Sequence, residues 1–206
     1  PESLRDQAAA RLVELIHEND GLMATGFIGT KHLLPVLTRF GYNELAYELL
    51  TSSRCPSWLY SVENGATTIW ERWNSYTRGE GFASAGMNSF CHYSFGAVCQ
   101  WMFGSMAGIE PAKPGFGGVK IAPVPGSGGI DRCEAYFRSA KGMIHTSWKL
   151  EGDRFALDVT IPPGSSATLV MPTVDSASIT ESGKPVSGVS RFVRLVGEEG
   201  DAVTYR

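Results

Sequence analysis

The chain has 206 residues, of which 43% are hydrophobic and 19% charged, and its formal net charge is −3. This balance excludes a disordered tail, a collagen-like repeat and a generic basic nucleic-acid-binding protein, so we expect no nucleic-acid partner. No stretch approaches the roughly eighteen consecutive apolar residues of a membrane-spanning helix, and the first residues, PESLRDQAAARL, lack the pattern of a signal peptide. We therefore expect one large domain or two modest ones, with no membrane segment.

The first half of the chain has the hydrophobic periodicity of helices, up to about Gly108. Apolar residues recur at spacings of three and four, which predicts about five helices. They fall within residues 4–16, 33–40, 45–50, 58–62 and 89–107. Asn43 is the expected N-cap of the third helix, and Ser89 or Asn88 is the expected N-cap of the fifth.

After the break EPAKPG, at residues 110–115, the apolar residues alternate with a period of two. Short segments of this kind, separated by turn residues, predict an antiparallel β-sandwich. The expected strands are 119–124, 133–138, 143–150, 155–161, 167–171, 192–196 and 202–205. The predicted fold class is therefore α+β with two domains, a helical one over residues 1–110 and a sandwich over 111–206.

The four cysteines are too few and too scattered to indicate a metal cluster or a disulfide framework. Cys55, Cys91, Cys99 and Cys133 form no CxxC pair, and no HExxH motif is present. We therefore expect free, partly buried thiols, and neither a catalytic metal nor a cofactor.

Eleven of the 22 aromatic residues lie within residues 56–103, including Trp58 and Trp70. Aromatic rings stack on the apolar faces of sugars, and they also build ordinary helical cores. Composition alone leaves both interpretations open.

Within this region, the segment GATTIWERWN places Glu71 between Trp70 and Arg72. A carboxylate among aromatic rings can act as an acid, a base or an anchor for hydroxyl groups, and Arg72 could keep it ionised through an ion pair. The alternative is a structural Glu–Arg pair that ties a loop to the helices. Glu63 and Glu80 are weaker candidates because their surroundings are polar.

His92 lies in a second segment with chemical potential, NSFCHYSFG at residues 88–96. On a helix, His92 would share a face with Gly96, Cys99 and Phe103. The missing side chain at Gly96 leaves room either for a ligand or for a neighbouring helix, so His92 is either a binding residue or a packing residue.

Several segments together resemble bacterial alpha-L-rhamnosidases, glycoside hydrolase family 78, in their order and spacing. These segments are TGFIGT (25–30), PSWLY (56–60), GATTIWERW (65–73), MNSFCHYSFGAV (87–98), AGIEP (107–111) and SWKLEGDRFALDVTIPPGSSATLVMP (147–172). The resemblance implies an (α/α)6 toroid followed by a C-terminal β-sandwich. It also implies hydrolysis of a rhamnose-containing glycoside, with release of terminal alpha-L-rhamnose and inversion at the anomeric carbon.

The resemblance assigns the role of general base to Glu71 and a contact with the sugar to His92. It suggests that Trp70 and Trp58 form or support the pocket wall. Cys91 stands where the family pattern has Asn, and Asn74 stands where it has Asp. These two departures concern local hydrogen bonding.

A six-hairpin toroid needs more helices than the five expected here, and the family's general acid lies upstream of the matching region. The resemblance therefore implies that residues 1–110 are the last part of a toroid and that the intact enzyme supplies the acid. We expect this part alone to be inactive and to self-associate or rearrange, because helices cut from a ring expose an apolar flank.

Two other functions remain open from the sequence. One is another (α/α)6 glycosidase, acting on fucose or glucose. The other is a non-catalytic carbohydrate-binding module in which the sandwich is the active part.

Overall fold

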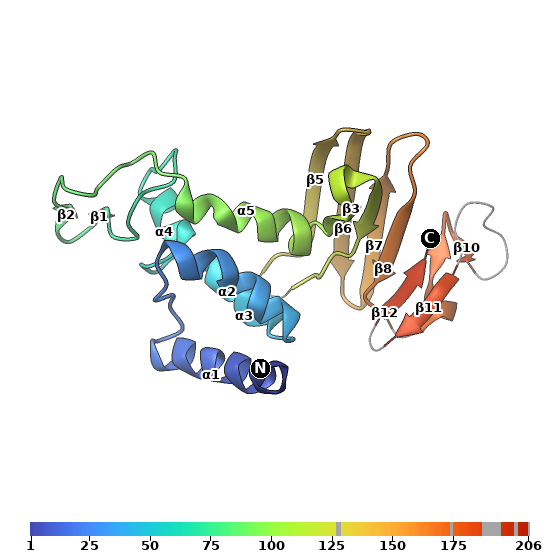
Figure 1. Cartoon of the computed structure of the whole chain (residues 1–206), viewed down its shortest axis with the longest axis horizontal. Coiled ribbons are helices and arrows are strands. Elements are labelled where there is room, and N and C mark those ends of the chain that lie inside the picture. The colour runs from blue at the N-terminus through green and yellow to red at the C-terminus, as the bar shows by residue number, and fades with distance from the viewer. Residues whose placement is uncertain (127–128, 174, 187–194, 200–201, 206) are drawn as a thin grey trace. The chain divides into compact units, whose positions relative to one another are not determined.

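The structure, a computed structural model, describes residues 1–126, 129–173, 175–186, 195–199 and 202–205 (Figure 1). The chain divides into two compact units by its internal contacts. One contains Pro1–Trp101 with Gly126–Gly129, and the other contains Met102–Pro125 with Ile130–Arg206. The α-helices lie almost entirely in the first unit and the longer strands in the second, in the order that the change of periodicity predicts.

The first unit is built from amphipathic helices, with a long connection over residues 64–93 between α4 and η2. These are η1 Glu2–Leu4, α1 Arg5–Glu18, α2 Phe27–Arg39, α3 Asn43–Thr51, α4 Trp58–Glu63, η2 Ser94–Ala97 and α5 Val98–Trp101. Asn43 is the first residue of α3 and Tyr42 is its N-cap, so the predicted cap at Asn43 is wrong. Ser57 caps α4, because its hydroxyl oxygen accepts a hydrogen bond of 3.0 Å from the amide of Tyr60.

The fifth helix begins later than predicted. Residues 88–93 are not helical, and the helical stretch starts with η2 and α5 and ends in a π-helical turn, Met102–Met106. Neither Asn88 nor Ser89 caps it. The backbone groups of Ser89 and His92 are instead hydrogen-bonded to the segment around Glu71, so they cannot take part in a helix.

The core of the first unit lies where α2, α3 and α5 meet. Leu34, Leu37 and Leu49, from the predicted stripes, are fully buried. Trp101 is also buried and packs edge-on against Tyr47, with 5.2 Å between the ring centroids. None of the helices in the described part of the chain is long and apolar enough to cross a membrane.

The second unit contains two larger sheets. The five-stranded sheet has the order β11 Leu195–Glu199, β12 Ala202–Tyr205, β8 Ala167–Met171, β4 Gly118–Ile121 and β3 Ile109–Lys113, and η4 Pro114–Phe116 links β3 to β4. The three-stranded sheet has the order β5 Arg132–Ser139, β6 Gly142–Glu151 and β7 Arg154–Thr160. Side chains of both sheets, including Ile121 and Ile144, pack into one hydrophobic core.

Two features of the larger sheet differ from the prediction. β4 pairs with β8 in parallel, with Val119 opposite Ala167, so the sheet is mixed rather than antiparallel. The three strands β5 to β7 intervene between β4 and β8, which gives the chain enough length for a parallel connection. β3 occupies the predicted break because Pro111, which lacks an N–H group, is tolerated on an edge strand.

Two short hairpins are absent from the prediction. β1 Tyr76–Thr77 pairs with β2 Gly81–Phe82 in the first unit, and β9 Thr180–Glu181 pairs with β10 Lys184–Pro185 in the second, preceded by η5 Ser176–Ser178. Residues 192–194 of one predicted strand lie outside the described residues.

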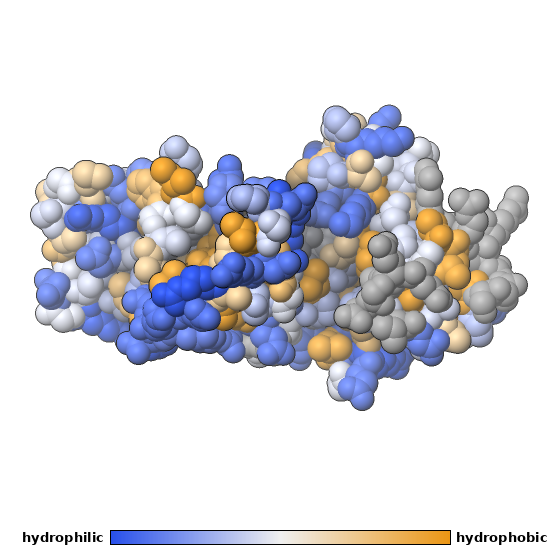
Figure 2. Space-filling model, turned by 60° about the horizontal axis from the view of Figure 1, so that its bottom comes forward, coloured by the Kyte–Doolittle hydropathy of each residue, from blue (hydrophilic) through white to orange (hydrophobic). Residues whose placement is uncertain are grey.

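Several large apolar side chains of the first unit are exposed. Ile28 is 88% exposed and Met87 is 71% exposed, and Phe82 and Tyr93 are also largely accessible. Figure 2 shows hydrophobic residues, in orange, that reach the surface between hydrophilic ones, in blue. Such exposure favours contacts with other protein surfaces.

Candidate active site

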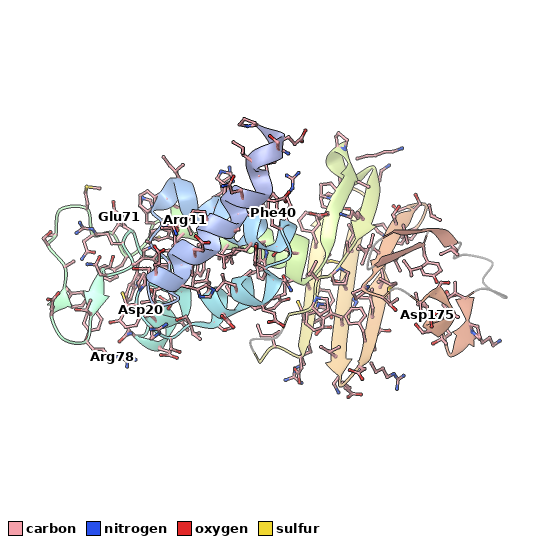
Figure 3. The ribbon with its side chains drawn as sticks, turned by 90° about the horizontal axis from the view of Figure 1, so that it is seen from below. Arg11, Asp20, Phe40, Glu71, Arg78 and Asp175 are labelled. Atoms are coloured by element: carbon pink, nitrogen blue, oxygen red, sulfur yellow. The ribbon has the colours of Figure 1, made fainter. Side chains whose placement is uncertain are left out.

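Glu71 lies in the coil between α4 and β1, at the same end of the helical unit as Arg78 (Figure 3). Its backbone amide donates a hydrogen bond of 2.9 Å to the carbonyl of Ser89. The amide of Ser89 donates one of 2.8 Å back to the carboxylate, at Oε2 of Glu71. The side chain is half-buried, and Oε1 has no hydrogen-bond partner among the described residues. One oxygen is therefore fixed and the other is available.

Arg72 does not hold this carboxylate. Among the described residues the two side chains form no ion pair, and Arg72 is exposed. The backbone amide of Arg72 donates to the hydroxyl of Ser75 at 3.1 Å instead. The expected Glu71–Arg72 pair is therefore wrong, and a main-chain N–H replaces the guanidinium as the partner of the carboxylate.

His92 stacks with two aromatic rings. The ring of Phe27 stacks on it at 4.8 Å with an interplanar angle of 14°, and Tyr93 stacks at 5.4 Å and 7°. The amide of Ser94 donates a long hydrogen bond of 3.4 Å to Nδ1 of His92. In the neutral ring this assigns the proton to Nε2, which makes Nε2–H the hydrogen-bond donor of this side chain.

His92 precedes the fifth helix, so it does not lie on a helical face with Gly96, Cys99 and Phe103 as predicted. Its backbone amide donates to the carbonyl of Ile69 at 2.8 Å. Together with the Glu71–Ser89 pair, this bond joins the two predicted motifs directly.

Thr68 adds a side-chain contact between the same segments, because its hydroxyl donates to the carbonyl of Phe90. Glu71 and His92 are thus carried by two backbone segments that are hydrogen-bonded to each other. The sequence motifs indicated both residues but gave no sign of this pairing.

Trp58 and Trp70 line a different feature, a hollow of about 270 Å³. Trp73 and Phe95 also line it, and they stack on each other at 3.8 Å between centroids. The indole N–H of Trp58 donates to the carbonyl of Phe95 at 2.9 Å. Glu71 is not among the lining residues. The two tryptophans therefore form part of the aromatic wall of a hollow that the Glu71 carboxylate does not line.

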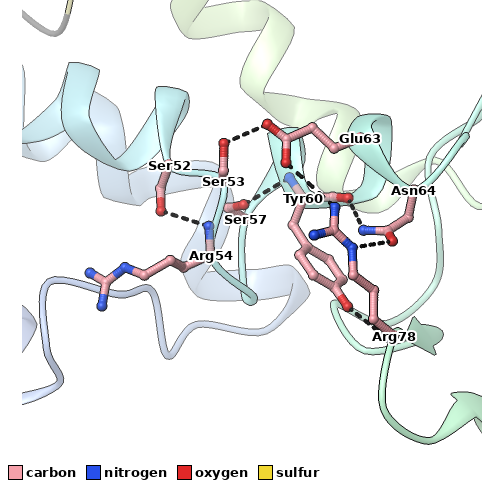
Figure 4. A network of polar contacts seen from close by, with 8 residues as sticks. All are labelled: Ser52, Ser53, Arg54, Ser57, Tyr60, Glu63, Asn64 and Arg78. Carbon is pink, nitrogen blue, oxygen red and sulfur yellow. Dashed lines mark hydrogen bonds and ion pairs between the residues drawn. The ribbon is translucent and has the colours of Figure 1, made fainter.

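A polar network that the sequence did not indicate surrounds Arg78 (Figure 4). Arg78 Nε donates to Oδ1 of Asn64 at 3.0 Å, and the Arg78 amide donates to the hydroxyl of Tyr60 at 3.2 Å. Glu63 lies 3.8 Å from the guanidinium and accepts a hydrogen bond of 2.6 Å from Ser53. This network anchors the β1–β2 hairpin to α4 and gives Glu63 a structural role.

All four cysteines are free thiols, but the predicted partial burial is confirmed only for Cys55 and Cys133. Burial raises the pKa of the Cys55 and Cys133 thiols, whereas Cys91 and Cys99 are exposed. In the described part of the chain, His, Cys, Asp and Glu side chains form no group of three or more that could hold a metal ion.

Comparison with known protein families gives two matches. Residues 1–106 match the bacterial alpha-L-rhamnosidase 6 hairpin glycosidase domain, and residues 108–185 match the bacterial alpha-L-rhamnosidase C-terminal domain. The chain belongs to the bacterial alpha-L-rhamnosidase family. The family resemblance drawn from the sequence motifs is thereby confirmed.

Individual members of this family are close in sequence. An alpha-L-rhamnosidase of Streptomyces avermitilis is 43% identical over 172 residues, which cover 84% of this chain and 17% of that protein. An alpha-L-rhamnosidase of Formosa agariphila is 39% identical over 178 residues, which cover 86% of this chain and 19% of that protein. The chain thus spans about a fifth of the length of these curated relatives.

Solved structures of rhamnosidases share the fold. The crystal structure of the Streptomyces avermitilis alpha-L-rhamnosidase complexed with L-rhamnose superposes with a TM-score of 0.87 at 37% identity, over 100% of this chain and 19% of that one. The native enzyme from Aspergillus terreus gives a TM-score of 0.78 at 38% identity, over 82% of this chain and 20% of that one.

Proposed function

We propose that this chain is the C-terminal part of an inverting alpha-L-rhamnosidase and supplies its general base. In this proposal residues 1–110 complete an (α/α)6 toroid and residues 111–206 form a β-sandwich. The six-hairpin family match supports the first assignment. The single core shared by the two larger sheets supports the second. The substrate is a glycoside with a terminal alpha-L-rhamnose.

Glu71 is the proposed base. The observation that carries the proposal is that a hydrogen bond holds one oxygen of its carboxylate, Oε2, and leaves the other available. The Ser89 amide holds Oε2, so Oε1 is free to take a proton from water. A main-chain donor fixes the carboxylate geometry without a flexible side chain.

In the proposed reaction, the water oxygen bonds to the anomeric carbon while the bond from that carbon to the leaving oxygen breaks. Glu71 takes a proton from the water, and a carboxylic acid on the opposite face of the sugar protonates the leaving oxygen. Inverting enzymes hold these two carboxyl groups about 6.5–9.5 Å apart, which leaves room for the water. The acid belongs to the rest of the intact enzyme.

His92 is the proposed sugar-binding residue. The stacked rings of Phe27 and Tyr93 fix the plane of the imidazole, so Nε2–H can point in one direction toward a sugar hydroxyl. Trp70 and Trp58 support this site as part of the aromatic wall rather than as hydrogen-bond partners of the sugar.

The test is the Glu71→Gln variant of the intact enzyme, assayed on an aryl alpha-L-rhamnoside. Loss of the base is expected to lower kcat by about 10²–10⁴-fold. Glu80→Gln makes the same chemical change on an exposed residue of the β1–β2 turn and should leave kcat unchanged. Proton NMR of the first product should show the inverted anomer. Full activity of Glu71→Gln, or a retained anomer, would contradict the proposal.

Two further measurements separate the proposal from its alternatives. The 206-residue chain alone should hydrolyse the aryl rhamnoside very poorly, because it lacks the acid. A panel of aryl glycosides given to the intact enzyme should show turnover of the rhamnoside well above that of the fucoside and the glucoside.

A further inference from the structure

The side chain of Asn88 closes the base of the β1–β2 hairpin. Its Nδ2 donates hydrogen bonds of 3.2 Å to two carbonyls, those of Ser75 and Ala83. These residues flank the hairpin, and the Ala83 amide also donates to the Ser75 carbonyl, at 3.0 Å. One amide group therefore joins the two chain segments that enter and leave the hairpin.

The Ser75 end of this contact reaches the residue that follows Glu71. Ser75 is fully buried, and its hydroxyl accepts a hydrogen bond of 3.1 Å from the Arg72 amide. The Ser75 amide donates one of 3.2 Å to the Arg72 carbonyl. Residues 72–75 thus form a closed turn, and the Asn88 bond to the Ser75 carbonyl fixes this turn in place.

The other end of the contact reaches Glu71 through the neighbour of Asn88. Ser89 exchanges two hydrogen bonds with Glu71, one of them to the carboxylate. Fixing Asn88 therefore fixes the amide that holds Oε2. Glu71 is constrained from both directions along the chain, and Asn88 takes part in both constraints.

The orientation of the Asn88 amide shows which of its groups matters. Its Oδ1 is buried without a hydrogen-bond partner among the described residues. A buried acceptor without a partner is unfavourable. Rotating the amide by half a turn would place Oδ1 against two carbonyl oxygens, so the two donated bonds determine the orientation.

We propose that Asn88 is a positioning residue for the base: its two hydrogen bonds hold the Ser89 amide on the Glu71 carboxylate. This inference rests on the proposed role of Glu71. Asn88 acts through Glu71 and does not itself touch the substrate.

The first test uses the 206-residue chain and needs no activity. Amide hydrogen exchange of Glu71 and Ser89 is measured by NMR in wild type and in Asn88→Ala. The variant should exchange at both amides about tenfold faster, since opening of the base of the hairpin releases both bonds. Amides of α2 and β6 should keep their wild-type rates, which shows that the variant is folded. Ser84→Ala, an exposed change on the same loop, is the control.

The second test uses the intact enzyme and separates kcat from KM on an aryl alpha-L-rhamnoside, with the enzyme concentration corrected for the folded fraction. Asn88→Ala should lower kcat about tenfold and leave KM near the wild-type value, because a carboxylate that is held less firmly is less often in the reactive position. Ser84→Ala, the exposed control on the same loop, should change neither constant.

The outcomes distinguish this inference from the proposed function. If Glu71→Gln is inactive while Asn88→Ala keeps the wild-type exchange rates and kcat, the positioning role is overturned and the base stands. If Glu71→Gln is active, both are overturned. Faster exchange at Glu71 and Ser89 together with a lower kcat at an unchanged KM supports the positioning role.

Discussion

The indole of Trp101 donates a hydrogen bond of 2.8 Å to the hydroxyl of Thr38, and this hydroxyl donates one of 3.3 Å to Oδ1 of Asn43. A single hydroxyl thereby connects α5, α2 and α3. Trp101 is only 2% exposed, so its N–H group depends on Thr38 for a partner.

Removal of this hydroxyl should destabilise the first unit. Thr38→Val keeps the shape of the side chain but leaves the buried indole N–H without its acceptor. The expected loss in the free energy of unfolding is about 1–3 kcal/mol, measured by urea denaturation with tryptophan fluorescence. Thr67→Val, at an exposed position, should change it by less than about 0.5 kcal/mol. Equal stability of the two variants would show that the contact contributes nothing.

Gly108 cannot be replaced by a residue with a side chain. Its φ of +78° is unfavourable for other residues, and a Cβ would overlap the backbone and ring of Pro123. Gly108→Ala should lower the free energy of unfolding of the second unit by more than about 1 kcal/mol. Gly79→Ala is the control, because a Cβ there has open space and the φ is not positive. A Gly108→Ala variant that unfolds at the wild-type urea concentration would contradict the predicted overlap.

The exposed face of the three-stranded sheet should stabilise the protein in a pH-dependent way. Glu134 accepts hydrogen bonds from Tyr136 at 2.7 Å and from His145 at 3.0 Å, and these hold its pKa below the ordinary value of 4.5. The folded protein thus binds a proton at Glu134 more weakly than the unfolded chain. The stabilisation is therefore present above pH 4.5 and is lost as the pH falls below it.

Glu134→Gln tests this dependence. The difference in Tm between wild type and variant should be largest near neutral pH and should shrink as the pH falls below about 4. Glu181→Gln, an exposed residue whose side chain forms no ion pair among the described residues, should show no such trend. A difference that stays constant from pH 7 to pH 3 would count against the interaction.

The apolar surface of the first unit should make the isolated chain associate. Ile28→Lys and Met87→Lys place charges on two highly exposed apolar positions and should lower the apparent mass at high concentration in light scattering. Met143→Lys, on β6 in the second unit, should have a smaller effect. Monomeric behaviour of the wild-type chain at all concentrations would rule the association out.

Hydrophobic periodicity predicted most of the secondary structure because it reflects which side chains of a helix or strand are buried. The stripes that include Leu34, Leu37 and Leu49 became helices, and the alternation in β5 to β7 became a sheet. The start of the fifth helix and the parallel pairing of β4 with β8 were missed. Both depend on hydrogen bonds between segments far apart in the sequence, which a local pattern does not contain.

The candidate site was predictable in part, for a similar reason. Glu71 and His92 stand in motifs of distinctive composition, so their residue types could be recognised. The role of the Ser89 amide could not be recognised from the sequence, because every residue except proline has a backbone N–H and this group carries no sequence signal. The Phe27 ring that stacks on His92 comes from a third segment, and only the tertiary structure unites the three.

The parallel pairing of Val119 with Ala167 also determines the order in which the second unit can assemble. The ribbon of β5, β6 and β7 joins neighbours along the chain, so it can form as soon as residue 160 has left the ribosome. The backbone groups of β4 are paired on both sides only after β8 has been synthesised. Those of β8 are paired on both sides only after β12 has been synthesised. During synthesis β4 therefore presents an open edge to any other nascent strand, and a binding chaperone would be most useful in that interval.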